Sequence, residues 1–173
     1  MIIIVAGVSG SGKTTVGALV AGRLRWRFAD ADTFHPPANV EKMRAGVPLT
    51  DEDRVPWLHA VAAWIDERIA AGQSAVVTCS ALKRSYRDLL LTGRPEATLV
   101  FLMVDRDILL RRVSARPDHF FPEKLLQSQL DTLEMPSATE EPHVRIIVAN
   151  GDMAETAAEV MAVLWPYGEP AGA

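Results

Sequence analysis

Short apolar runs alternate along the chain with longer segments in which apolar residues recur every three or four positions. The runs have the length of strands and span residues 2–6, 26–29, 74–79, 99–104 and 145–149. Helical spacing predicts helices over 13–25, 38–45, 56–71, from 84, after Asp105, over 123–133 and up to about Trp165. Strands that alternate with helices predict an α/β fold in which helices cover a five-stranded parallel sheet.

The eight residues after the first apolar run fit the phosphate-binding P-loop pattern G-x-x-x-x-G-K-[ST]. Its glycines let the backbone N–H groups turn toward phosphate oxygens, and the following helix adds positive charge at its N-terminus. Lys13 is expected to reach the β- and γ-phosphates, and the Thr14 hydroxyl to bind Mg²⁺. The expected nucleotide-binding residues are Gly7, Ser9, Gly10, Ser11, Gly12, Lys13, Thr14 and Thr15.

Composition narrows the classes of protein that this chain can represent. Its 173 residues suit one domain over 1–173, and 49% hydrophobic with 23% charged residues is ordinary for a globular protein. No apolar stretch approaches the length of a membrane span and the start lacks a secretory pattern, so we expect a cytoplasmic protein. The net charge of −4 argues against a basic nucleic-acid groove. The single Cys79 allows no internal disulfide and is expected to be a packed thiol.

Two carboxylates follow the second predicted strand, next to the P-loop in such a sheet. Transfer of a phosphoryl group needs a group that holds the acceptor hydroxyl and takes its proton. Asp32 suits that role better than a turn residue, whereas for Asp30 a turn and a role at Mg²⁺ are equally open. Asp105 after the fourth strand is either a second Mg²⁺ carboxylate or, as we prefer, a helix cap.

Basic residues cluster in two parts of this acidic chain. Arg111, Arg112 and Arg116 surround a Pro-containing loop, where Arg112 and Arg116 are expected to act on the phosphates from a lid. A second group in the middle segments suggests an anionic acceptor, and an arginine fork suits a carboxylate. Its members are Lys42, Arg54, Lys83, Arg84 and Arg87. His35 precedes Pro36-Pro37 where the acceptor is expected, and no His, Cys and Asp grouping has metal-ligand spacing.

Sequence blocks beyond the P-loop carry a resemblance to a known family. They include Asp30-Ala31-Asp32 with His35-Pro36, Asp53-Arg54 with Pro56-Trp57-Leu58, Cys79-Ser80-Ala81-Leu82-Lys83-Arg84, His119-Phe120-Phe121 and Ser128-Gln129. On these residues the chain resembles the gluconokinases of the small P-loop carbohydrate-kinase type, relatives in fold of shikimate and adenylate kinases. The match runs from Ile4 to about Pro136.

The resemblance implies a three-layer α/β/α P-loop fold with a mobile helical lid at about 112–136. It further implies a homodimer that uses ATP and Mg²⁺ to phosphorylate D-gluconate at its 6-hydroxyl, giving 6-phospho-D-gluconate and ADP. Asp32 would hold or deprotonate the acceptor hydroxyl, Thr14 and Asp30 would serve the metal, and Lys13, Arg112 and Arg116 would act on the phosphates. The implied sugar-acid pocket contains Asp32, His35, Lys42, Arg54, Lys83 and Arg87.

Other classes of P-loop protein fit the residues less well. A kinase for shikimate or a nucleoside monophosphate remains open, since a basic middle segment suits any anionic acceptor. A nucleotide-switch GTPase would need an Asn/Thr-Lys-x-Asp sequence and an Asp-x-x-Gly switch, and neither occurs. An ATP-driven remodeller or nucleic-acid motor would need further domains or a basic groove.

Overall fold

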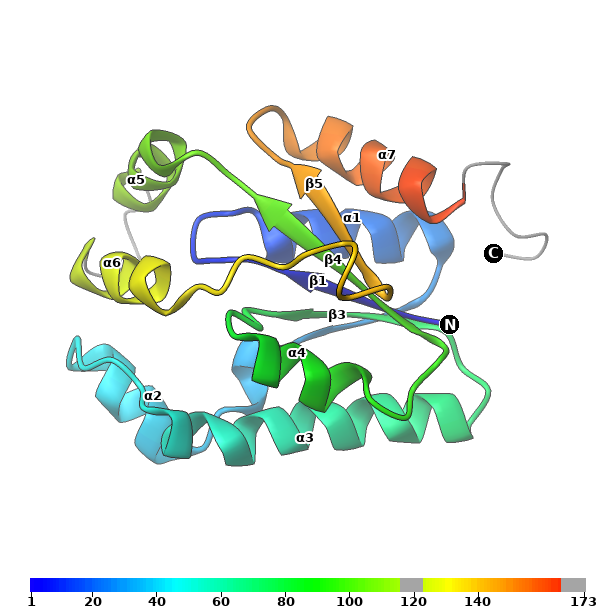
Figure 1. Cartoon of the computed structure of the whole chain (residues 1–173), viewed down its shortest axis with the longest axis horizontal. Helices are drawn as coiled ribbons and strands as arrows, with labels where there is room; N and C mark the ends of the chain where they lie inside the picture. Colours follow the sequence, from blue (N-terminus) through cyan, green and yellow to red (C-terminus); the bar gives the residue numbers. More distant parts are fainter. Residues whose placement is uncertain (116–122, 166–173) are drawn as a thin grey trace.

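The five strands form one parallel sheet in the order β2-β3-β1-β4-β5, as the computed structural model of residues 1–115 and 123–165 describes it (Figure 1). In the central part of the sheet Ile4 pairs with Val77 on one side and with Leu99 on the other. Strand order and direction agree with right-handed crossovers through helices. The strands are β1 (Ile2–Ala6), β2 (Arg27–Asp30), β3 (Ala75–Cys79), β4 (Ala97–Met103) and β5 (Val144–Val148).

Helices cover both faces of the sheet, which gives the three-layer α/β/α arrangement expected from the sequence (Figure 1). Alternate residues of β1 divide the core: Ile3 and Val5 pack with α1 and α7, whereas Ile2 and Ile4 pack with α3 and α4. The helices are α1 (Lys13–Leu24), η1 (Ala31–Phe34), α2 (Pro37–Arg44), α3 (Asp51–Ala70), α4 (Arg84–Leu91), α5 (Arg106–Ser114), α6 (Glu123–Thr132) and α7 (Met153–Leu164).

The helices α2, α5 and α6 lie beyond the carboxyl ends of the strands, on the side of the P-loop (Figure 1). A separate apolar cluster holds α5 and α6 there, with Val8, Leu82, Leu109 and Leu126 buried in it. Ligands of open parallel sheets bind at this edge, so the arrangement predicts the place of the functional site.

The structure corrects the start of one helix. The sequence predicts a helix from Pro56, but α3 begins five residues earlier, at Asp51. Thr50 and Asp53 form a capping box, in which Thr50 Oγ1 accepts from the Asp53 N–H and Asp53 Oδ2 accepts from the Thr50 N–H. This cap fixes the earlier start, and Pro56 stands inside the helix at the cost of one backbone hydrogen bond.

The remaining predicted strands and helices are present, with ends that differ by one or two residues. Within residues 1–115 and 123–165, none of the helices has the length and the apolar composition that a membrane crossing requires. Cys79 is fully buried in β3, and burial raises the pKa of its thiol to about 12, as suits a packed and unreactive side chain.

Candidate active site

A cavity of about 470 Å³ opens at the carboxyl edge of the sheet, between the P-loop and the helices beyond it. Its walls come from the P-loop, η1, α2 with the loop after it, the start of α3, and the facing sides of α5 and α6. The cavity is large enough for small ligands that bind in protein clefts. Segments distant in sequence therefore meet around one site.

The P-loop has the backbone shape that a phosphate cradle requires. Gly10 and Gly12 have φ angles of +80° and +90°, a region that side chains disfavour. A Cβ on Gly10 would lie 2.9 Å from Val113 Cγ2 on α5, so the close approach of that helix also requires glycine. Ser11 Oγ is buried and has no hydrogen-bond partner in the described part of the chain. The free donors of this loop and of the α1 N-terminus fit a bound phosphate.

The predicted nucleotide-binding residues lie together, although not all of them face the cavity. Those that line it are Ser9, Gly10, Gly12, Lys13 and Thr14. Gly7 and Ser11 are buried within the loop, and Thr15 is exposed on α1 outside the lining. Across residues 1–115 and 123–165, no carboxylate lies within ion-pair distance of Lys13, so its charge is available to a ligand.

The two aspartates after β2 have different surroundings. Asp30 Oδ2 accepts a hydrogen bond of 2.9 Å from Thr14 Oγ1, and its Oδ1 accepts one of 3.1 Å from the Asp32 N–H. Asp30 is thus fixed against the first turn of α1, where Thr14 and Asp30 together offer oxygen ligands of the kind that Mg²⁺ prefers. Asp32 lines the cavity instead. Of the two aspartates, only Asp32 is therefore among the residues that line the cavity.

Arg54 supplies a buried positive charge to the cavity wall. It is 8% exposed, and its Nε donates to the Leu49 carbonyl at 3.4 Å. No carboxylate within ion-pair distance of Arg54 is found among the described residues. A guanidinium in this position is costly unless an anion pairs with it. The arrangement is suited to a ligand carboxylate or phosphate.

The structure does not bring Lys42 and Lys83 to the cavity. Lys42 Nζ lies 2.7 Å from Asp53 Oδ1, and Lys83 Nζ lies 2.6 Å from Asp51 Oδ2. Hydrogen bonds from these lysines hold the pKa of each carboxyl below its usual value. Both lysines therefore tie neighbouring segments to the N-terminus of α3, the helix that carries Arg54.

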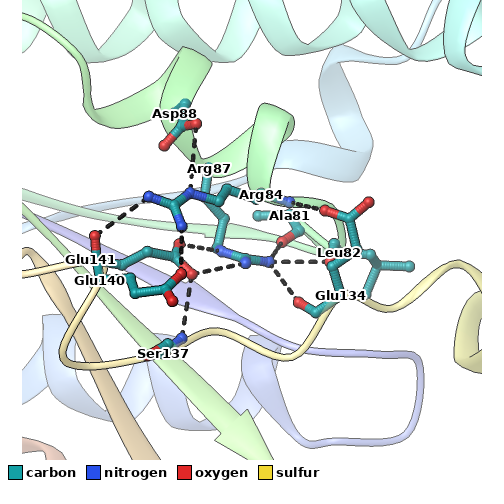
Figure 2. Close-up of polar contacts among 9 residues, drawn as sticks. All are labelled: Ala81, Leu82, Arg84, Arg87, Asp88, Glu134, Ser137, Glu140 and Glu141. Carbon is teal, nitrogen blue, oxygen red and sulfur yellow. Dashed lines mark hydrogen bonds and ion pairs between the residues drawn. The ribbon is translucent and has the colours of Figure 1, made fainter.

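The expectation that Arg87 lines the sugar-acid pocket is corrected by the structure, in which Arg87 is not among the residues that line the cavity. Arg87 is 1% exposed and its Nε donates to Glu141 Oε2 at 2.6 Å (Figure 2). Its remaining donors bind the other oxygen of Glu141 and the carbonyls of Ala81, Leu82 and Glu134. Through hydrogen bonds from all three guanidinium nitrogens, Arg87 joins the loop after β3 to the chain after α6.

The expected lid arginines are also placed differently from the prediction. Arg112 donates to the carbonyls of Ala149 at 3.1 Å and Gly151 at 2.9 Å, so in this structure its guanidinium holds the loop before α7 and does not line the cavity. Arg116 lies outside the described residues. Of the predicted lid at about 112–136, the end of α5 and all of α6 are described.

Several cavity residues were missed by the sequence prediction. Gln129 on α6 faces the P-loop, and its Oε1 accepts a 2.7 Å hydrogen bond from the Ser9 N–H. Arg44 and Ser80 also line the cavity. Gln129 and Ser80 belong to the sequence blocks that carry the family resemblance, so the resemblance could have indicated them as site residues. For Arg44 the sequence offered only its positive charge.

His35 is the predicted pocket residue whose surroundings are most closely defined. It lines the cavity, stacks on Trp57, and lies near Asn39, a buried residue of α2. Burial is the main cause that lowers its pKa; the negative charge of Asp32 opposes this effect, and the positive charge of Arg54 adds to it.

A phosphate-binding loop that shares one cavity with a carboxylate and an unpaired arginine defines a P-loop kinase of small molecules. Comparisons with known proteins agree with this class. The family model described as shikimate kinase matches residues 9–165. The gluconokinase of Gluconobacter oxydans is 49% identical over 83% of this chain and 80% of its own. By this similarity the chain belongs to the gluconokinase family.

Solved structures agree with that assignment. The unliganded structure of a sugar kinase from Janibacter superposes with a TM-score of 0.87 and 43% identity over 94% of this chain and 93% of that one. A gluconokinase from Sinorhizobium meliloti gives a TM-score of 0.78 and 40% identity over 96% and 97% of the two chains. As a member of a kinase family the chain uses ATP and acts on a small molecule.

Proposed function

We propose that this protein transfers the γ-phosphoryl group of ATP to the 6-hydroxyl of D-gluconate, giving 6-phospho-D-gluconate and ADP. The observation that carries the proposal is the buried Arg54, which shares the cavity with Lys13 and Asp32. Relatives with 49% and 42% identity are named gluconokinases. An acceptor that carries both a carboxylate and a hydroxyl matches a cavity that offers both an arginine and a carboxylate.

At the nucleotide end, the P-loop N–H groups and Lys13 would hold the phosphates and stabilise the negative charge of the transition state. Thr14 and Asp30 would serve Mg²⁺, which when bound neutralises phosphate charge. The described residues contain no group of three or more His, Cys, Asp or Glu side chains that could hold a metal ion. This fits a cation that keeps several waters and binds phosphate oxygens, as Mg²⁺ does.

At the acceptor end, Asp32 would accept the proton of the acceptor hydroxyl as the hydroxyl oxygen bonds to phosphorus and the bond to ADP breaks. Arg54 would bind the carboxylate with paired N–H donors and so orient the far end of the acceptor. Holding both ends places the hydroxyl in line with the phosphoryl group.

Several further expectations belong to this proposal. Arg112 and Arg116 would act on the phosphates when the lid at about 112–136 closes, which for Arg112 requires release of the carbonyls that it now holds. The protein would work as a homodimer in the cytoplasm, without nucleic-acid or membrane partners.

The test is the release of ADP by the purified protein with MgATP and a panel of acceptors. The panel contains D-gluconate, shikimate, AMP, D-glucose and no acceptor, and the Lys13→Ala variant is the control for contaminating kinases. We expect turnover with D-gluconate alone and none from the variant. Release of ADP without an acceptor would contradict the proposal by indicating an ATPase. Preference for shikimate or AMP would support the assignment as a kinase but contradict D-gluconate as its substrate.

A further inference from the structure

The imidazole of His35 is held in one plane by a surface that is itself anchored. Its ring stacks on Trp57 with 4.3 Å between centroids and 14° between planes. Trp57 is 1% exposed, and its Nε1 donates to the Ala31 carbonyl at 2.6 Å. Rotation of the His35 ring out of this plane would lose the stacking, so the ring is held in this plane, and its contact with Asn39 orients Nδ1 within the plane.

Asn39 fixes which nitrogen of His35 carries the proton. Asn39 Nδ2 lies 2.8 Å from the Asp53 carbonyl oxygen and 3.3 Å from His35 Nδ1. A carbonyl oxygen only accepts, so the atom that faces Asp53 must be the NH₂ group, which determines the orientation of the amide. The same NH₂ group faces His35 Nδ1, and that nitrogen must therefore be the acceptor. The ring proton then lies on Nε2.

The surroundings also favour the neutral ring over the charged one. An imidazolium would place an N–H on Nδ1 directly against the NH₂ donor of Asn39, which is 4% exposed and cannot easily turn away. The charged groups that face His35 are Asp32 from η1 and Arg54 from α3, of opposite sign. Burial lowers the pKa of His35, in agreement with this geometry.

We propose that Asn39 is a positioning residue that keeps His35 as the neutral tautomer with its proton on Nε2. His35 then acts in the acceptor site as a hydrogen-bond donor to a hydroxyl oxygen of a polyhydroxy acid, and Asp32 alone accepts the proton. The role toward the acceptor rests on the proposed function, whereas the tautomer follows from the contacts of His35 and Asn39.

The tautomer is measured by ¹⁵N NMR of the histidine ring nitrogens in the full chain without ligands, at pH 7. The His35 signals are assigned by their loss in His35→Gln. We expect an unprotonated Nδ1 and a protonated Nε2. A proton on Nδ1, a charged ring, or an equilibrium mixture of tautomers would overturn the proposal. This measurement needs no substrate, so it stands apart from any failure of the proposed function.

The Asn39→Asp variant tests the positioning role. A carboxylate at this position accepts from an Nδ1–H, so we expect the variant to show a protonated Nδ1 and a higher pKa of His35. An unchanged tautomer and pKa in a folded variant would overturn the role of Asn39. If the variant does not fold, Asn39→Ala replaces it, with the expectation that the single tautomer becomes a mixture.

The donor role is tested by kcat/KM for D-gluconate in two variants of His35. The amide of His35→Gln retains an N–H donor at about the place of Nε2, so we expect it to stay within about three-fold of the original protein. His35→Ala is expected to lose about ten-fold or more, with the KM for ATP unchanged. Equal losses in the two variants would overturn the donor role. His59→Gln, on an exposed residue of α3, is the control and should change nothing.

Discussion

Arg54 and Arg87 are both buried arginines near the carboxyl edge of the sheet, yet their surroundings are opposite. Arg87 meets Glu141 through two hydrogen bonds of 2.6 and 2.9 Å and uses its other donors on backbone carbonyls. Arg54 makes one long bond to a carbonyl and otherwise faces the cavity. Each carries the same charge at a similar depth, 8% exposed for Arg54 and 1% for Arg87.

The difference indicates that Arg87 stabilises the fold, whereas Arg54 is available to bind a ligand. Removing one partner of a buried ion pair leaves the other charge unpaired, which costs several kcal/mol of stability. Removing an arginine for which the described residues provide no carboxylate partner relieves an unpaired charge and costs binding instead. The comparison therefore predicts a loss of stability at Arg87 and a loss of affinity at Arg54.

The largest effect is expected from Arg87→Met. The substitution removes the charged partner of Glu141 and the guanidinium hydrogen bonds to three carbonyls, and we expect the free energy of unfolding to fall by about 3–5 kcal/mol. Urea denaturation measures this loss. If the variant does not fold, Glu141→Gln, which keeps the shape of the side chain, should give a smaller loss in the same direction. A free energy of unfolding within about 0.5 kcal/mol of the original protein would contradict a structural role for Arg87.

The next effect is expected from Arg54→Met. We expect kcat/KM for D-gluconate to fall about 100-fold because the carboxylate loses its charged partner, while the KM for ATP stays unchanged. Thermal unfolding is the second measurement, and the melting temperature should stay the same or rise. A marked loss of stability with unchanged kinetics would place Arg54 beside Arg87 as a structural residue.

A smaller change in free energy, confined to the chemical step, is expected from Asp32→Asn. The amide cannot accept the proton, so kcat should fall well over ten-fold while nucleotide binding persists. Asp30→Asn is the matched variant on the neighbouring aspartate, which contacts Thr14, and it should weaken the binding of MgATP. If Asp32→Asn weakens nucleotide binding instead, Asp32 helps to bind Mg²⁺ and does not act on the acceptor.

The smallest effect is a difference in acid stability. Hydrogen bonding from Arg87 lowers the pKa of Glu141 in the folded protein. The resulting stabilisation is complete above the unfolded pKa of about 4.3 and is lost as the pH falls through the folded pKa. Stability should therefore fall more steeply below about pH 4.3 in the original protein than in Glu141→Gln. Urea denaturation over a pH series measures both slopes.

A control for this slope comes from the neighbouring residue. Glu140 pairs with Arg84 at the surface, where its side chain is 68% exposed. Because exposed pairs contribute little, Glu140→Gln should keep the slope of the original protein. Equal slopes in all three proteins would show that the Arg87 pair does not differ from a surface pair.

The sequence predicted most of the fold because strand and helix periods are local properties. The pocket position of Arg54 followed only from the family resemblance, whereas the P-loop and Asp32 were predicted from motif and order, since the carboxyl ends of parallel strands meet at one edge. The roles of Arg87, Lys42 and Lys83 were not, because a basic residue in the sequence does not reveal which carboxylate will neutralise it. Asp51, Asp53 and Glu141 supply those partners from other segments.

The orientation of His35 by Asn39 was also beyond sequence analysis, since it depends on where the Asp53 carbonyl lies once α3 has its cap. The capping residues Thr50 and Asp53 were visible in the sequence, but the predicted helix started at Pro56. The sequence thus contained the capping residues that begin α3, but Pro56 was taken as the start of the helix.

The most direct test of the claim that Arg54 binds the carboxylate of the acceptor compares two substrates in two proteins. D-Glucitol has the hydroxyl chain of D-gluconate with an alcohol in place of the carboxylate, so kcat/KM for both compounds is measured for the original protein and for Arg54→Met. The account predicts that the original protein prefers D-gluconate by about 100-fold or more and that Arg54→Met reduces this preference to about three-fold. A variant that keeps the full preference would show that the carboxylate is bound elsewhere.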